Sequence, residues 1–172
     1  MVVLSYPAGA GADDQDHSRT QQGFNIAPVR LSLHGRNHEL VGLGSYLVNA
    51  VGGCNDCHTN PPYLAPSLGA VNQVNTAAYL GGGVVFGPFV SRNITPDKTG
   101  LPAGLTFGEF LQLIRTGIDP DQLHPQLGPY LQVMPWPAYR KLTDRDLRAI
   151  YEYLTTIPCL EGGPGEPPNR CG

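Results

Sequence analysis

The sequence predicts an all-α domain whose few helices are separated by long irregular segments. Three stretches carry apolar residues at helical spacing and have recognisable ends, and no alternation of strands and helices lies between them. The 172 residues include 22 Gly and 17 Pro without a repeating period, and 41% of them are hydrophobic. This length and composition fit one modest core with long connecting segments.

The first expected helix covers residues 38–51. Its apolar face at 3.6-residue spacing consists of Leu40, Leu43, Gly44, Leu47 and Val51. Asn37 is a suitable N-cap, and Gly52 with Gly53 provides a stop. The chain is therefore expected to leave this helix directly into the segment that follows Gly53.

Two further helices are expected near the C-terminal half. Thr106 with Glu109 three residues later forms a capping-box pattern, and Gly117 ends that segment. Thr143 caps the last helix, whose apolar stripe continues until Pro158 ends the element.

The remaining segments predict little regular structure. Residues 1–37 are expected to be a mostly irregular leader, whose small residues resemble signal-peptide cleavage sequences although no basic region precedes its apolar run. Residues 60–105 alternate turn signals with short apolar stretches. Such a long irregular insert in a compact domain usually has a role, such as lining a bound group.

Charge and hydropathy exclude two classes of protein. The formal charge is −3, from 11 basic and 14 acidic residues, and no Lys/Arg cluster is present, which argues against a nucleic-acid partner. No run approaches the roughly 20 apolar residues that a membrane-spanning helix needs. We therefore expect contact with a membrane only by association.

The most informative motif is GGCNDCHTN, in which Cys54 and Cys57 are followed at once by His58. A redox dithiol would need strand and helix alternation around the motif, and a zinc site would need more ligands near it. C-x-x-C-H is also the attachment signature of a c-type haem. Two thiols at this spacing can each add to one vinyl group of the haem, and the next residue brings an imidazole to the haem iron.

A second axial ligand would strengthen that interpretation. Met134 is the only methionine besides Met1, and it lies in an irregular, Pro-flanked segment before the last helix. A thioether is a soft ligand for haem iron, although a single Met often only fills a gap in a core. His124 is a rival ligand, because it also lies in an irregular segment before that helix.

The chain resembles class I c-type cytochromes, and most of all the cytochrome c modules of bacterial alcohol and aldehyde dehydrogenase complexes. The segments that carry this resemblance are GSYLVNAVGGCNDCHTNP, SRNITPDKTGL, TFGEFLQLIRTGID and MPWPAYRKLTDRDLRAIYEYLTTIP. The resemblance covers roughly residues 38–158. It implies a class I cytochrome c fold, with a few helices around one covalently bound haem c, a long irregular insert and an N-terminal extension.

By this resemblance Cys54 and Cys57 hold the haem, His58 is the proximal iron ligand and Met134 the distal one. The first and last helices would cross, near Gly44 and Tyr46 on one side and Tyr151 and Leu154 on the other. The carbonyl before Pro61 or Pro62 would accept the His58 Nδ1 proton and fix the tautomer.

Three polar or aromatic residues are candidates for contact with the haem. Arg92 and Asn93 have the donors to bind its propionates, or else Arg92 is solvated and Asn93 caps a turn. Trp136 either donates its indole N–H to a propionate or packs on the porphyrin edge.

Cys159 and Cys171 are expected to form a disulfide in a C-terminal tail of residues 159–172. Haem attachment to c-type cytochromes takes place outside the cytoplasm, where spare cysteines pair. The resemblance therefore implies a periplasmic or otherwise extracytoplasmic bacterial protein.

The function expected from these observations is single-electron transfer by a monohaem cytochrome that cycles between Fe(III) and Fe(II), not enzymatic catalysis. Its partners would be a donor dehydrogenase and an acceptor oxidase or carrier. Alternatives are a haem enzyme or ligand sensor with a labile distal ligand, a dedicated subunit of a dehydrogenase complex, and a monohaem building block of a larger electron-conducting array.

Overall fold

The computed structural model describes residues 12–64, 73–120, 128–162 and 169–172. Its helices are α1 (Ala12–Ile26), α2 (His38–Tyr46), the π-helix η1 (Leu47–Val51), α3 (Cys54–His58), the short 3-10 helix η2 (Thr76–Ala78), α4 (Phe107–Thr116), α5 (Trp136–Tyr139) and α6 (Asp144–Leu154). Two antiparallel pairs of very short strands are β1 (Tyr63–Leu64) with β2 (Gln73–Val74), and β3 (Val85–Phe86) with β4 (Phe89–Val90). The described part is therefore mainly helical, with a few short strands that the expected all-α class did not include.

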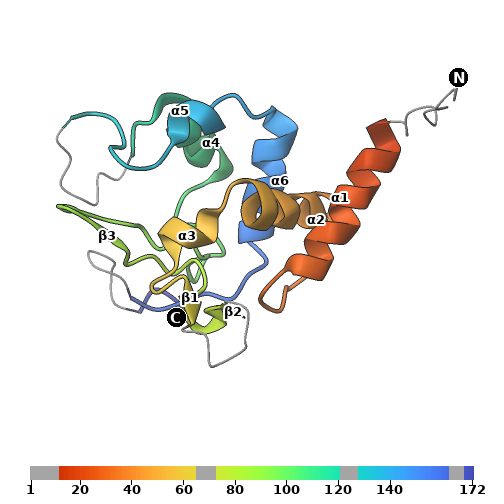
Figure 1. Cartoon of the computed structure of the whole chain (residues 1–172), viewed down its shortest axis with the longest axis horizontal. Coiled ribbons are helices and arrows are strands. Elements are labelled where there is room, and N and C mark those ends of the chain that lie inside the picture. Colours follow the sequence, from red (N-terminus) through yellow and green to blue (C-terminus); the bar gives the residue numbers. More distant parts are fainter. Residues whose placement is uncertain (1–11, 65–72, 121–127, 163–168) are drawn as a thin grey trace, which may run out of the picture.

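Helix α2 lies between α1 and α6 and packs against both (Figure 1). Glycines make this close packing possible. A Cβ atom added to Gly42 would lie 2.6 Å from the Thr20 carbonyl oxygen of α1, and one added to Gly44 would lie 1.9 Å from the Ala149 carbonyl oxygen of α6. The crossing of α2 and α6 at Gly44 was predicted, but on α6 the closest approach falls at Ala149 and Tyr153.

The core at this crossing combines aliphatic and aromatic side chains. It contains Val41, Val48, Tyr79, Leu80, Tyr153, Leu154 and Ile157. The hydroxyl groups of Tyr79 and Tyr153 lie 2.9 Å apart, and the Tyr79 hydroxyl donates to the Asn49 Oδ1 atom at 2.6 Å. Burial raises the pKa of both tyrosines above the ordinary value of 10.0. This network joins η1, η2 and α6 in the interior.

The three expected helix starts are confirmed. The Asn37 side chain accepts from the Leu40 amide at the start of α2. Thr106 and Thr143 each form a complete capping box, with Glu109 at α4 and Asp146 at α6. The last helix ends at Leu154, a few residues before the proline that was expected to end it.

The prediction that residues 1–37 are largely irregular is wrong for α1. This helix lacks a pronounced apolar face, and it is held to α2 by backbone proximity at Gly23 and by a hydrogen bond of 2.7 Å from the Ser45 hydroxyl to the Gly23 carbonyl. Arg145 of α6 also pairs with Asp16 and with Glu39. The periodicity that reveals most helices is absent here because glycine, polar groups and a single large apolar side chain, Phe24, make the contact.

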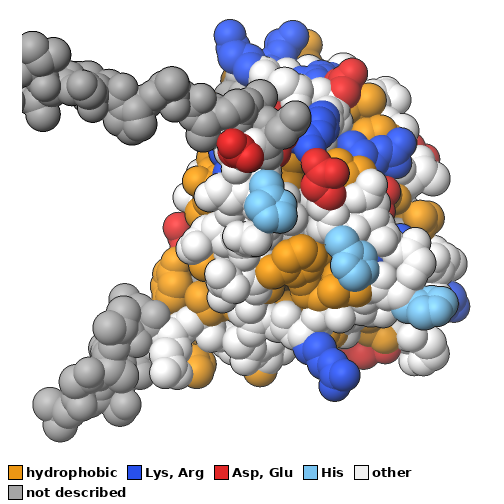
Figure 2. All heavy atoms as spheres, turned by 90° about the vertical axis from the view of Figure 1, so that its right-hand side faces the viewer, with side chains coloured by type: hydrophobic (Ala, Val, Ile, Leu, Met, Phe, Trp, Pro, Cys, Tyr) orange, Lys and Arg blue, Asp and Glu red, His pale blue; other side chains and the backbone are white. Residues whose placement is uncertain are grey.

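The surface on the α1 side carries exposed histidines among charged and hydrophobic side chains (Figure 2). His17, His34 and His38 are all exposed, as expected for residues outside a buried site. Figure 2 shows histidine side chains on this face, together with acidic and basic groups. Within the described ranges, no helix is long and apolar enough to span a membrane.

Candidate cofactor site

The C-x-x-C-H motif forms the single helical turn α3. Gly53, with φ of 58°, occupies the N-cap position in a left-handed conformation, so that the chain turns sharply from η1 into α3. Residues three and four positions apart share one face of a helix. Cys54, Cys57 and His58 therefore present their side chains together, and all three line the same cavity.

This cavity has a volume of about 260 Å³, much more than the water-sized voids of a packed core. Most of its wall is apolar and comes from the helices η1, α4 and α6 and from the segment before α4: Leu47, Val48, Leu105, Leu113, Leu147 and Leu154. Phe86 and Phe89 of the β3–β4 hairpin add aromatic rings. Part of the long insert thus lines the cavity, which is the role that its length suggested.

The surroundings of the two cavity cysteines favour the thiol over the thiolate. Burial raises the pKa of Cys54 to about 12 and also raises that of Cys57, with the nearby Asp56 carboxylate adding to the effect at both thiols. They are not joined to each other. A redox dithiol would instead need a lowered thiol pKa, so this environment disfavours that alternative.

His58 is held in one tautomer by a backbone carbonyl. Its Nδ1 atom donates to the Arg92 carbonyl oxygen at 2.7 Å, which leaves Nε2 as the free lone-pair atom. Burial lowers the pKa of His58 and the Arg92 charge adds to this, while the hydrogen bond opposes it. The expectation that the carbonyl before Pro61 or Pro62 plays this role is wrong.

The reason lies in the path of the insert. The Pro61 carbonyl accepts from the Asn75 side chain at 3.1 Å, and the His58 backbone carbonyl accepts from the Gly82 amide at 2.6 Å. Gly82 lies directly against the backbone of residues 91–93. The chain returns to His58 through this close contact, which a larger residue at position 82 would prevent.

Met134 lines the same cavity as the α3 motif. It immediately precedes Pro135, the N-cap of α5, and its carbonyl accepts from the Trp136 amide at 2.8 Å. The Tyr139 hydroxyl of α5 donates to the Gly52 carbonyl at 2.7 Å. Helix α5 thus ties the Met134 segment to the entry of α3.

Arg92 faces the cavity, but it already has protein partners. Its guanidinium donates to the Ala103 carbonyl at 2.6 Å and pairs with Asp119 at 3.2 Å. Asp119 also lines the cavity and is buried. The sequence did not single out Asp119, because nothing local shows that an acidic residue after α4 meets a guanidinium 27 positions earlier.

Asn93 and Trp136 do not line the cavity. The buried Asn93 side chain hydrogen-bonds Thr95 and the C-terminal tail instead. The Trp136 ring stacks on Tyr130 with centroids 5.8 Å apart and lies over Gly117, where an added Cβ would be 2.3 Å from the ring. His124, the rival axial ligand, lies outside the described residues.

The donor set at the cavity fits a covalently bound haem. Two thiols and an imidazole share one helical face, a thioether faces the same space, and the wall between them is apolar. Among the described residues no group of three or more His, Cys, Asp or Glu side chains is arranged so that it could hold a metal ion by itself, so the zinc alternative finds no support there.

Comparison with known proteins agrees with this fit. The chain is 35% identical over 119 residues, 66% of its length, to the fructose dehydrogenase cytochrome subunit of Gluconobacter japonicus. It is 31% identical over 123 residues, 69% of its length, to the gluconate 2-dehydrogenase cytochrome c subunit of Pantoea cypripedii. It is also 29% identical over 62% of its length to a diheme cytochrome c-type protein of Cereibacter sphaeroides.

Each match covers only a part of the relative's length. The chain spans 20% of the first of these proteins, 23% of the second and 33% of the third. No protein-family model matches the chain, and no solved structure matches it significantly. The similarity thus supports a cytochrome c module of the kind found in dehydrogenase cytochrome subunits.

Proposed function

We propose that this chain is a monohaem electron-transfer module that serves a dehydrogenase. One haem c would be held through Cys54 and Cys57, with the His58 imidazole and the Met134 thioether as ligands of its iron. The observation that carries the proposal is the convergence of the α3 motif and Met134, 76 positions after His58, on one apolar cavity.

The bound haem supplies an iron that exchanges one electron between Fe(III) and Fe(II). The residues of the chain determine how readily it does so. His58 is neutral and oriented by the Arg92 carbonyl, so that Nε2 is available as a ligand. The Met134 thioether favours Fe(II), and the apolar wall excludes water and raises the potential further.

Arg92 is proposed to stabilise a haem propionate at the cavity wall. Its guanidinium lies there beside Asp119, so that an incoming carboxylate would share or replace that partner. Asn93, with its side chain directed to the tail, has no part in this proposal.

The partners proposed are a dehydrogenase as electron donor and an oxidase or another carrier as acceptor. The names of the relatives, which are cytochrome subunits of fructose, alcohol and gluconate dehydrogenases, support the donor class. The Cys159–Cys171 disulfide supports an extracytoplasmic location, because such bonds persist in oxidising compartments.

An optical spectrum of the oxidised, haem-loaded protein tests the axial ligands. We expect the weak far-red band of sulfur bound to ferric haem in the wild type, and its loss in Met134→Ala. Val133→Ala is the matched control, because Val133 also lines the cavity but has no donor atom.

A wild type without the far-red band would contradict Met134 ligation. The distal ligand would then be His124 or none, and a sensor or haem enzyme with an open iron site would replace the electron carrier. A protein that carries no covalently attached haem at all would contradict the proposal as a whole.

A further inference from the structure

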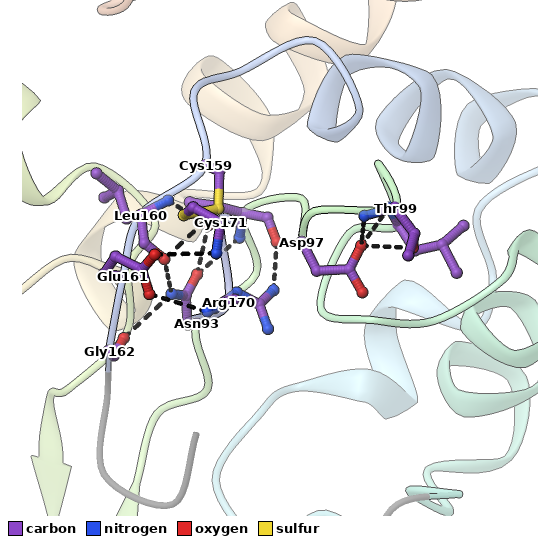
Figure 3. The surroundings of a disulfide bond; sticks show 11 residues. Asn93, Asp97, Thr99, Cys159, Leu160, Glu161, Gly162, Arg170 and Cys171 are labelled. Carbon is purple, nitrogen blue, oxygen red and sulfur yellow. Dashed lines mark hydrogen bonds between the residues drawn. A yellow bond between two sulfur atoms is a disulfide. The ribbon is translucent and has the colours of Figure 1, made fainter. Parts of the chain in front are cut away.

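The C-terminal tail is built into the structure beside the residue that orients His58. Cys159 and Cys171 form a disulfide with Cα atoms 5.8 Å apart, which confirms the predicted pairing. Figure 3 shows the Asn93 side chain beside the tail residues Leu160 and Gly162, close to this disulfide. The tail therefore contacts the chain one residue after Arg92.

The Asn93 side chain uses all of its polar groups in this contact. Its Nδ2 atom donates to the Leu160 carbonyl at 3.0 Å and to the Gly162 carbonyl at 3.2 Å. Its Oδ1 atom accepts from the Thr95 amide at 3.0 Å and from the Thr95 hydroxyl at 2.7 Å. Asn93 is 1% exposed, so breaking these bonds would leave buried polar groups unsatisfied.

The far end of the tail fastens the same segment a second time. Arg170 donates to the Thr95 carbonyl at 2.6 Å, and its own carbonyl accepts from the Lys98 amide at 2.7 Å. The Glu161 carboxylate accepts from the amides of Arg170 and Cys171 at 2.9 and 3.1 Å. The disulfide and Glu161 thus hold both ends of the tail against residues 93–98.

The held segment continues directly into the acceptor of the His58 proton. The Arg92 carbonyl, which receives the Nδ1 hydrogen bond, belongs to the peptide group whose N–H is that of Asn93. A peptide group is planar, so a displacement of Asn93 turns this carbonyl as well. A shift of the tail would therefore change the direction of the carbonyl that accepts the His58 Nδ1 hydrogen bond, because one rigid peptide group joins the two.

We propose that the disulfide-closed tail is a positioning element for the proximal ligand. Cys159, Cys171 and Glu161 act through Asn93 to keep the Arg92 carbonyl directed at the His58 Nδ1 atom. This inference rests on the proposed haem ligation. A firm hydrogen bond at Nδ1 makes the imidazole a better donor to iron and favours Fe(III), so loosening it raises the midpoint potential.

The test compares haem-loaded variants of the full chain. In Cys159→Ser/Cys171→Ser we expect a midpoint potential above that of the wild type. We also expect exchange of the His58 Nδ1 proton, followed by NMR, to become roughly tenfold faster, as for the loss of one net hydrogen bond. Glu161→Gln, an exposed substitution that leaves the disulfide intact, should shift both quantities in the same direction by less.

Thr143→Ala is the matched control, because it removes the α6 cap and lowers stability without contacting the tail or Arg92. An unchanged potential and exchange rate in both tail variants would overturn the inference, and so would an equal shift in the control. If the double variant does not accumulate, Glu161→Gln alone decides. Absence of haem from the wild type would instead refute the proposed function, before any tail variant is compared.

Discussion

The α1–α2–α6 crossing and the cavity side of this molecule are packed in opposite ways. At the crossing, glycines bring helix backbones together, and the interior hydroxyl and amide groups satisfy one another. On the cavity side, α3, α4, α5 and the β3–β4 hairpin leave about 260 Å³ between apolar walls. The first region is filled with protein atoms, whereas the second encloses the cavity to which the proposed haem is assigned.

The largest expected effect is the loss of haem attachment on the cavity side. Cys54→Ala/Cys57→Ala should abolish covalent haem attachment, because no other described thiol lines the cavity. Mass spectrometry of the denatured protein measures this directly, as loss of the haem mass. Cys159→Ser/Cys171→Ser serves as the control and should retain the added mass; if the first variant retained it as well, the attachment site would lie elsewhere.

The next largest effect is a loss of stability at the α2–α6 crossing. A methyl group at Gly44 would lie 1.9 Å from the Ala149 carbonyl oxygen and 2.7 Å from the Tyr153 Cβ atom, both on the packed face of α6. Gly44→Ala should therefore lower the free energy of unfolding by about 3 kcal/mol or more, as severe overpacking does. Denaturant unfolding measures the change.

Gly108→Ala is the matched control for that experiment. A methyl group there would meet no atom closer than the Thr106 hydroxyl at 4.0 Å. Alanine should raise the stability of α4 by up to about 0.5–1 kcal/mol, because it restricts the unfolded chain. Equal losses in both variants would show that the crossing is not tightly packed.

A smaller change separates polar from apolar stabilisation at the crossing. Tyr153→Phe removes the hydroxyl that lies 2.9 Å from the Tyr79 hydroxyl and 3.3 Å from the Asn49 Nδ2 atom. We expect a loss of about 1–2 kcal/mol, since buried partners are left with fewer hydrogen bonds. Thermal unfolding at neutral pH measures it, and Tyr130→Phe, at an exposed position, should change nothing.

Tyr153→Phe should also change how the free energy of unfolding depends on pH. Burial raises the pKa of Tyr79 and Tyr153 in the folded state, so the unfolded chain releases these protons first as the pH rises through the ordinary value of 10.0. Their contribution to stability is complete below that pH and falls above it. Tyr153→Phe should make the fall less steep; an identical pH dependence would contradict burial of this hydroxyl.

The smallest expected effect concerns the attachment of α1. Arg145→Ala removes the ion pairs with Asp16 and Glu39, which are only partly buried. The loss should be about 0.5–1 kcal/mol at low salt and should shrink as salt is added. Arg19→Ala, whose carboxylate partner is 3.9 Å away within α1, should cost less. A loss that is independent of salt would mean that Arg145 acts through packing.

Sequence signals predicted the helices whose ends are fixed locally. Asn37, Thr106 and Thr143 are caps that need only the next three residues, and each works as expected. Helix α1 escaped prediction because its contact with α2 is made by Gly23, polar groups and the single aromatic ring of Phe24, which together leave no apolar period. Local chemistry is readable from the sequence, whereas backbone contact between helices is not.

The residues of the cavity site show the same difference between local and long-range contacts. The α3 motif identified Cys54, Cys57 and His58 because a single helical turn holds them. The acceptor of the His58 proton is 34 positions away, and the Asn93 side chain, which caps a turn at Thr95, also meets a tail 67 positions away. Such pairs depend on how the insert and the tail return to α3, and no local pattern encodes that path.

The π-helix η1 accommodates about one residue more over Leu47–Val51 than an α-helical turn would. It leads through Gly52 and Gly53 into α3. Ala50 is exposed, so many side chains fit at this position. Deleting it would let the segment rewind as an α-helix, and the residues that follow would keep nearly the same direction about the axis, because the lost residue is the one that the wider turn holds in excess. In an evolving gene, this stretch is therefore the place before α3 where the loss of one codon would disturb the haem-attachment motif least.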